Sequence, residues 1–279
     1  AFWRFRHQAY TKNTPHDGYG IMAKWGASKK YGFFCVTSNI DGHWGRTPGI
    51  TPEQVWECHG TLLYVHAMEG NQALTRTDDE MISGLQVPDW DVKPGDLVEV
   101  QLVAKDLHSG DEDKYMFDES AEWAPAKIDE DGASVVGSDG LQLECRAVRK
   151  PGGEDMMRVR AGTPLPTTPD GRPLRPAVLM FGDGGVNTDR IMRQRGRYDT
   201  WKAKLPHGAK VAVVEVGAGT ALATIRSLAE TLAADFPHAT FVRVNPEYSG
   251  VPEELKSRSC SMARGALDAA KALAACGAV

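Results

Sequence analysis

Two patterns of hydrophobic and polar residues divide this chain into a middle part and two outer parts. In the outer parts, short apolar runs bounded by glycine or polar residues predict buried parallel strands. These runs are Tyr31–Ser38, Val55–Gly60, Arg175–Asp183, Lys210–Thr220 and Ala239–Ser249. Apolar residues at helical spacing predict helices at Ala1–Tyr10, Asn187–Trp201, Ala221–Leu232 and Ser261–Ala275. This alternation of strand, turn and helix predicts an α/β fold with a Rossmann-like, doubly wound parallel sheet.

The middle part has a different pattern. Between about Pro88 and Arg160, charged residues are denser and apolar residues alternate, with Val98, Val100 and Leu102 on one face of a strand. Asp-Gly turns at 131–132 and 139–140 separate further short strands, which predicts an antiparallel meander or small barrel. We therefore expect a Rossmann-like domain from residues 1–60 and 174–279, interrupted by a small β-rich domain from residues 61–173.

Composition narrows the classes of function. Of the 279 residues, 42% are hydrophobic and 25% are charged, as in an ordinary globular protein. The formal net charge of −5 gives no electrostatic case for direct nucleic-acid or membrane-surface binding, and no apolar run reaches the roughly 18 residues of a membrane span. The five cysteines form no CxxC pair, which argues against a disulfide framework and favours free thiols in an intracellular compartment, cytoplasmic or nuclear.

Polar motifs follow each predicted strand of the outer parts. They are TSNIDGHW after the first strand, then CHG, MFGD, GAGT and VNPEY. Because ligands of open parallel sheets bind beyond the carboxyl ends of the strands, five such motifs can converge on one crevice. The pattern favours a nucleotide site.

Taken in order, these motifs resemble those of the sirtuin family of NAD-dependent protein-lysine deacylases. TSNIDGHW is similar to the family's Thr-Gln-Asn-Ile-Asp-Gly-Leu/His, ECHG to its Glu-x-His-Gly, and RPAVLMFGD to its Arg-Pro-x-Val-Val-x-Phe-Gly-Glu. EVGAGT stands where the family has a Gly-Thr-Ser turn, and VNPE resembles its Ile-Asn-Pro. Order and spacing match from about Ala1 to Ala275, apart from the long middle insertion.

The resemblance implies that His59 is the general base. It would act on a ribose hydroxyl of NAD while nicotinamide leaves and the acyl oxygen of a substrate lysine attacks the ribose carbon. A histidine suits this task because its unperturbed pKa lies near neutrality. Without the other motifs, a histidine at a strand end is more often a structural residue satisfied by the backbone.

The resemblance also implies a set of binding residues. The loop that holds nicotinamide and its ribose would contain Thr37, Ser38, Asn39 and Asp41. The phosphates or adenine ribose would bind at Gly217, Ala218, Gly219 and Thr220, and the adenosine ribose hydroxyls at Asn245 and Glu247. One wall of an acyl-lysine tunnel would be formed by Leu179, Phe181 and Gly182. For each set the alternative is purely structural: turn-forming residues, an ordinary β–α turn, or a plain core strand.

Three features depart from the family. The stretches 68–79 and 165–174, where its zinc cysteines belong, contain no cysteine, so we predict no structural zinc and no other metal. Nothing before Tyr31 resembles the family's first strand and Gly-Ala-Gly-x-Ser turn, so we expect this chain to be a piece of a longer protein. Ser38 replaces a family glutamine, and Asp183 replaces a glutamate.

The insertion resembles the opening strands of SH3- or Tudor-like barrels. Such modules often bind methylated peptides in aromatic cages, for which the candidates here are Trp90, Tyr115, Phe117 and Trp123. A purely structural β insertion is the favoured alternative.

The sequence therefore predicts a zinc-free, NAD-dependent protein-lysine deacylase whose partner is an acylated protein-lysine peptide. One alternative keeps the fold but makes the protein an NAD hydrolase or ADP-ribosyltransferase. Another is a catalytically degenerate module that binds NAD or peptide. Nothing in the sequence indicates the oligomeric state.

Overall fold

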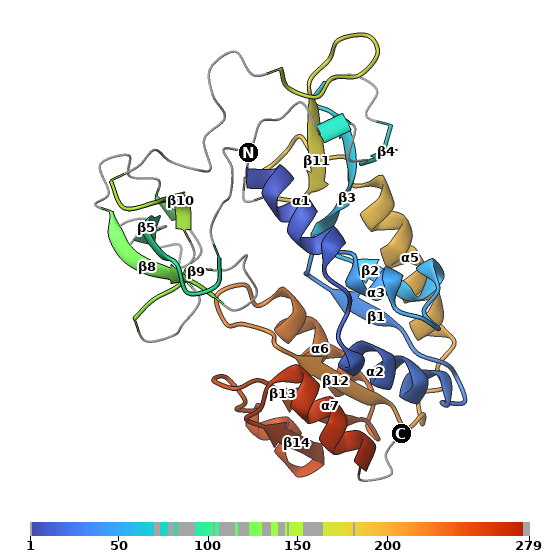
Figure 1. The fold of residues 1–279 in the computed structure, drawn as a ribbon. Helices are drawn as coiled ribbons and strands as arrows, with labels where there is room; N and C mark the ends of the chain where they lie inside the picture. The colour runs from blue at the N-terminus through green and yellow to red at the C-terminus, as the bar shows by residue number, and fades with distance from the viewer. Residues whose placement is uncertain are drawn as a thin grey trace. The chain divides into compact units, whose positions relative to one another are not determined.

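The chain folds as a mixed α/β protein with both parallel and antiparallel sheets, seen in a computed structural model (Figure 1). It forms two compact units: unit 1 is residues 1–12 with 62–176, and unit 2 is residues 13–61 with 177–279. The expected α/β class is confirmed. The structure describes residues 2–69, 73–77, 81–82, 93–102, 104–105, 115–116, 123–129, 135–138, 143, 145–152, 164–180 and 182–275.

Unit 1 begins with the expected N-terminal helix, which runs as α1 (Phe2–Lys12). A three-stranded sheet in the order β11-β3-β4 follows, from β3 (Gly60–Ala67), β4 (Thr75–Arg76) and β11 (Leu174–Val178). The divisions between the units fall inside β3 and β11, so the first two residues of β3 and the last two of β11 belong to unit 2.

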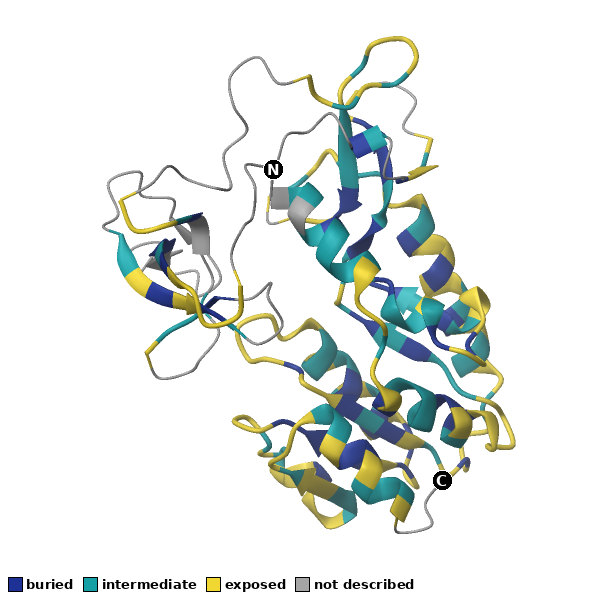
Figure 2. Ribbon diagram, viewed as in Figure 1, coloured by how far each residue is buried: buried dark blue, intermediate teal, exposed yellow. Residues whose placement is uncertain are grey.

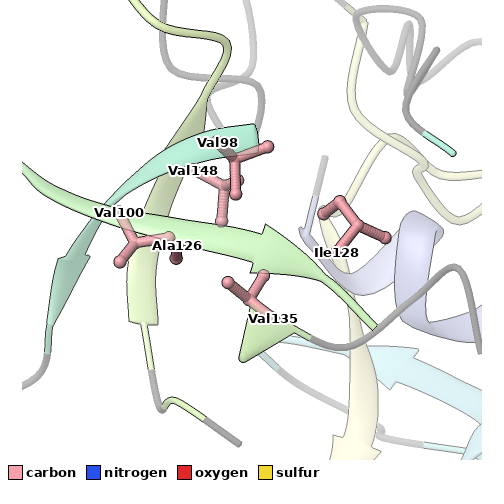
Figure 3. Close-up of a cluster of buried hydrophobic side chains, with 6 residues drawn as sticks. All are labelled: Val98, Val100, Ala126, Ile128, Val135 and Val148. Carbon is pink, nitrogen blue, oxygen red and sulfur yellow. The ribbon is translucent and has the colours of Figure 1, made fainter. Parts of the chain in front are cut away.

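The rest of unit 1 contains the antiparallel strands predicted for the insertion. A four-stranded sheet has the order β10-β5-β8-β9, and two more strands pair as β6-β7. Their bounds are β5 (Leu97–Leu102), β6 (Ala104–Lys105), β7 (Tyr115–Met116), β8 (Ala124–Ile128), β9 (Val135–Val136) and β10 (Cys145–Arg149). Because alternate residues of a strand face the same side, the inward set forms a core (Figure 3) from Val98, Val100, Ala126, Ile128, Val135 and Val148.

Several predictions for the insertion fall outside the described residues. These are the two Asp-Gly turns, the side chain of Leu102, and the cage candidates Trp90, Phe117 and the Tyr115 side chain. Trp123 is described, and the guanidinium of Arg149 lies over its ring, 4.0 Å from the centroid. Arg149 also donates to Glu99 of β5 at 2.6 Å, so the exposed side of this small sheet carries its own ion pair.

Two parallel sheets lie wholly within unit 2. One joins β1 (Cys35–Thr37) to β2 (Val55–Glu57), and the other has the order β12-β13-β14, from β12 (Ala212–Val216), β13 (Thr240–Val244) and β14 (Ser259–Met262). The predicted strands are present at the expected places but are shorter. Within the described residues they form two sheets instead of one continuous doubly wound sheet.

The helices of unit 2 include the predicted α5 (Asp189–Ala203). The others are α2 (Asp17–Ala27), α3 (His43–Arg46), α6 (Thr224–Asp235) and α7 (Ala266–Ala275), with 3₁₀ turns at Pro52–Gln54 and Glu253–Arg258. The predicted start of the closing helix at Ser261 is wrong, because Ser261 and Met262 pair with β13 and the helix begins only after Gly265. Likewise α6 begins three residues later than predicted.

Helices cover the three-stranded sheet of unit 2. One apolar cluster joins α6 to the sheet through Val213, Ala229, Ala233, Phe241 and Leu255. Figure 2 shows buried residues running along β12 and β13. Another cluster joins α7 to the sheet through Val242, Val244 and Ala269. In the part of the chain that the structure describes, no helix has the length and apolar character needed to cross a membrane.

The turn between β2 and β3 depends on Gly60. Its φ of +82° is in the left-handed region, and a Cβ at this position would overlap the carbonyl oxygen of Ala177 in β11. The close approach lets the N–H of Leu179 donate to the carbonyl oxygen of His59 at 2.9 Å. Glycine at position 60 therefore sets how His59 lies against the end of β11.

We expect Gly60→Ala to destabilise the protein strongly. The substitution combines a positive φ with overlap against backbone, which together should lower the free energy of unfolding by about 3 kcal/mol or more. Gly49→Ala is the matched control, since Gly49 has φ +85° but a Cβ added there would meet nothing within 4 Å; it should cost about 1–2 kcal/mol. Urea unfolding of both variants measures the difference, and equal losses would contradict the assigned role of the close approach.

Candidate functional site

Three loops of unit 2 meet around His59. The N–H of Cys58 donates to the carbonyl oxygen of Thr37 at 2.9 Å, which joins the carboxyl ends of β1 and β2. The hydroxyl of Thr61 donates to the carbonyl oxygen of Ile40 at 3.3 Å. Together with the bond from Leu179 to His59, these contacts hold the loop 38–42, the turn 58–60 and the end of β11 beside one another. The sequence-predicted residues of these three loops are thus brought together.

His59 has the properties of a proton acceptor. Its side chain is half-buried, and burial lowers the pKa of its imidazole below the ordinary value. A lowered pKa keeps the ring neutral at physiological pH, and a neutral imidazole nitrogen can take a proton from a hydroxyl group. This is the protonation state that a general base needs.

A buried polar network anchors the strand that leads to His59. Glu57 is 4% exposed, and its carboxylate lies 2.5 Å from Arg190 Nη1 of α5. Gln194 of α5 accepts the N–H of Glu57 at 3.0 Å and donates to its carboxylate at 3.4 Å. Sequence reasoning gave these three residues no role, although Glu57 belongs to the Glu-x-His-Gly motif. Their contacts fix the end of β2 against α5, two elements that lie side by side in Figure 1.

The loop after β1 is built mainly by its own side chains. The hydroxyl of Thr37 is buried and accepts the N–H of Asn39 at 3.1 Å. Asp41 accepts the N–H of His43 at 2.8 Å, so its carboxylate closes an Asx turn just before α3. Ser38 is half-buried and Asn39 is exposed. Of the four predicted loop residues, Ser38 and Asn39 keep side chains available to a ligand.

His43 is a candidate residue that sequence reasoning missed. Its Nδ1 lies 3.6 Å from Asp41 Oδ2, and its Nε2 has no hydrogen-bond partner among the described residues. The ring of Tyr19 packs edge-on against it at 5.8 Å. Burial, with the Asp41 charge adding, raises the pKa of Tyr19 to about 12. The sequence signal that could have identified His43 is its position in the motif TSNIDGHW, directly before Trp44.

The predicted tunnel wall carries exposed apolar side chains. Leu179 and Met180 follow β11 and are 39% and 42% exposed, which is high for large hydrophobic residues beside a strand end. Gly182 is exposed with φ +66°, and Phe181 lies outside the described residues. Met180 was not among the predicted contacts. The pair Leu179 and Met180 offers an apolar edge directly beyond the carbonyl group of His59.

The loops after β12 and β13 form a second group of candidate residues. Asn245 is 5% exposed; its amide donates to the carbonyl oxygen of Ala218 at 3.0 Å. Its side-chain oxygen accepts the N–H groups of Glu247 and Tyr248 at 3.0 and 2.9 Å. Asn245 therefore ties the two loops together and shapes the turn that follows. The exposed residues of this group are Gly217, Gly219, Thr220 and Glu247.

Beneath this second group lies a buried ion-pair network. Glu215 and Arg243 are register partners on β12 and β13, and Arg243 donates twice to the Glu215 carboxylate, at 2.7 Å each. Arg243 also donates to Glu230 and to the carbonyl oxygen of Gly250, both at 2.6 Å. Burial alone would lower the pKa of Arg243, but its carboxylate partners outweigh burial and raise it. Both partners of the central pair are at most 2% exposed.

Arg226 of α6 extends this network to both loops. It donates to the carbonyl oxygens of Ala218 at 3.0 Å and Tyr248 at 2.8 Å, and lies 4.0 Å from the Glu215 carboxylate. The candidate residues thus fall into two groups, each held by hydrogen bonds. Among the described residues, no cluster of three or more His, Cys, Asp and Glu side chains is placed to hold a metal ion. The absence of zinc stays a prediction.

We expect Arg243→Met to cost about 3–5 kcal/mol of unfolding free energy, because it leaves the Glu215 carboxylate buried without its partner. The double variant Glu215→Leu with Arg243→Met should lose less than the sum of the single losses, since neither charge then remains alone.

Lys256→Met is the control: its exposed pair with Glu253 should contribute less than about 1 kcal/mol. Urea unfolding of the single variants, the double variant and the control measures these losses. Additive losses in the double variant would show that the buried pair is not coupled.

Comparison with known proteins does not assign the chain to a family. The sequence matches no protein-family model and no curated protein. What the two groups of loops can do chemically therefore rests on their own residues and on the motif resemblance.

Proposed function

We propose that this protein is an NAD-dependent protein-lysine deacylase with a Rossmann-type domain. The observation that carries the proposal is the position of His59. It is a half-buried histidine of lowered pKa, held between the Ser38–Asn39 loop and an exposed apolar edge at Leu179 and Met180. A base, a polar loop and an apolar edge in contact are what transfer of an acyl group from a lysine side chain requires.

The second group of loops fits the diphosphate of a dinucleotide. A Cβ at Gly217 or Gly219 would meet nothing within 4 Å, so the backbone there is open to close approach by a phosphate. The following helix α6 has no side-chain cap and no acidic residue in its first turn, which leaves its N-terminal N–H groups to favour an anion. Thr220, which is exposed, adds a hydroxyl donor.

In this proposal NAD, when bound, supplies a nicotinamide leaving group and the ribose that receives the acyl group. His59 accepts a proton from a ribose hydroxyl, and Asn39 holds the nicotinamide amide. Leu179 and Met180 would cover the acyl chain, and an extended substrate peptide would lie along this edge. Exclusion of water by the apolar edge protects the acyl group until transfer is complete.

A second candidate is a non-catalytic module that binds NAD or peptide. Two side chains favour it: Asp41 closes a turn with the N–H of His43, and the side-chain oxygen of Asn245 accepts the N–H groups of Glu247 and Tyr248. Both side chains were expected to reach the cofactor, and both are instead engaged in building loops. The two candidates differ in whether acylated peptide makes the protein release nicotinamide.

We expect His59→Ala to reduce peptide-dependent nicotinamide release at least about 100-fold, since general-base catalysis contributes that much or more. Binding of NAD, measured by calorimetry, should be unchanged. The control is His238→Ala, which removes an exposed histidine after α6 and should leave the rate as it is. Full turnover by His59→Ala would refute the assigned base, and NAD loss without acylated peptide would favour a hydrolase.

The pH dependence of kcat/KM also tests whether His59 is the base. Because burial lowers the pKa of His59, the neutral base persists in more acidic solution than a free histidine would. The acid limb of kcat/KM should therefore lie below about pH 6.5, the ordinary histidine value. A limb at or above that pH would assign the essential base to another group.

A further inference from the structure

Unit 2 has a concave surface away from the loops around His59. A cavity of about 490 Å³, here named the basic groove, lies between α5 and the segments 31–34 and 53–54. These two segments come just before β1 and β2, whereas the candidate site comes just after them. In parallel strands the two ends lie on opposite edges of a sheet, so the basic groove is separate from the site of the proposed function.

Positive charge dominates the basic groove. The cations that line it are Arg193 and Arg197 on α5 and Lys204 just after the helix, against a single acid in the lining, Glu53. Arg197 is anchored by a hydrogen bond to the carbonyl oxygen of Pro52 at 3.1 Å. The side chains of Arg193 and Lys204 are exposed, and in the part of the chain described they form no ion pair. In a chain of net charge −5, this local excess of cations favours an anionic ligand.

Aromatic rings line the basic groove on both sides, with Tyr31, Phe33 and Phe34 before β1 and Trp201 on α5. Phe34 lies 5.8 Å from the ring of Trp201 and 5.4 Å from that of Tyr198. The indole N–H of Trp201 donates to the carbonyl oxygen of Tyr31 at 3.0 Å, which fixes the segment 31–34 against α5. Tyr31 itself is 41% exposed. A planar apolar group can pack against these rings while an anion faces the arginines.

Gly196 keeps the floor of the basic groove open. It lies in the middle of the 15-residue helix α5, where glycine is a poor helix former. A Cβ at this position would meet nothing within 4 Å, so no neighbour requires the small residue. Packing within the protein therefore does not account for the glycine, whereas a ligand lying over the helix would.

We propose that the basic groove binds a mononucleotide, with its phosphate on Arg193 and Arg197 and its base against the rings of Tyr31 and Trp201. The two arginines are four residues apart on one helix face, so their guanidinium groups can share one phosphate. A volume of about 490 Å³ is that of a small-molecule site and holds one such ligand. The proposal does not depend on the deacylase function.

The test is calorimetric titration of the full chain with adenosine 5′-monophosphate, with adenosine and inorganic phosphate as separate titrants. We expect the mononucleotide to bind, and each part alone to bind at least about tenfold more weakly. Arg193→Gln should weaken binding about tenfold or more, because it removes a charge-assisted hydrogen bond. Gly196→Met should abolish binding by filling the floor with a good helix former.

Arg195→Gln is the matched control on the same helix, because Arg195 is paired with Asp199 and does not line the groove. This variant should bind the mononucleotide as tightly as the parent protein does. Melting temperatures of all variants establish that they fold. Binding that survives Gly196→Met but is lost in Gly219→Val would place the mononucleotide at the proposed cofactor loop and overturn the groove proposal alone. Absence of mononucleotide binding to the parent protein would also overturn it.

Discussion

The buried pair of Glu215 and Arg243 constrains the part of unit 2 that carries the second group of loops. Two charges with almost no exposure are tolerable only when each is fully hydrogen-bonded, and Arg243 achieves this through Glu215, Glu230 and the carbonyl oxygen of Gly250. A slip of β12 against β13 would leave both charges unpaired. The register is therefore fixed, and with it the relative position of the loops that follow the two strands.

Around His59, too, buried residues fix the strands and leave the candidate residue accessible. Glu57, held by Arg190 and Gln194, fixes the end of β2, and Gly60 lets β11 approach closely. The residues that build the loops are buried and satisfied, while His59 stays half-buried with its ring available. In both groups a buried carboxylate lies two residues before a candidate residue: Glu57 before His59, and Glu215 before Gly217. Such support is what holds a functional side chain in a defined position.

Sequence reasoning succeeded where the information is local. The apolar runs at Tyr31–Ser38, Lys210–Thr220 and Ala239–Ser249 do contain β1, β12 and β13, because a short apolar run bounded by glycine or polar residues is a local signal for a strand. It failed at Ser261, where an Ala-rich helix pattern obscured a short strand that only pairing with β13 reveals. The Glu57 and Glu215 networks join residues far apart in the chain, which no local pattern encodes. Motif order identified the loops, but not which side chains would be engaged in building them.

We propose that the loops around His59 and the loops after β12 and β13 bind one NAD molecule. A crystal structure of the chain grown with NAD tests it most directly. We expect electron density for the nicotinamide ring beside His59 and for the diphosphate at Gly217–Thr220. NAD bound only in the basic groove, or crystals at saturating NAD with density at neither group of loops, would contradict it.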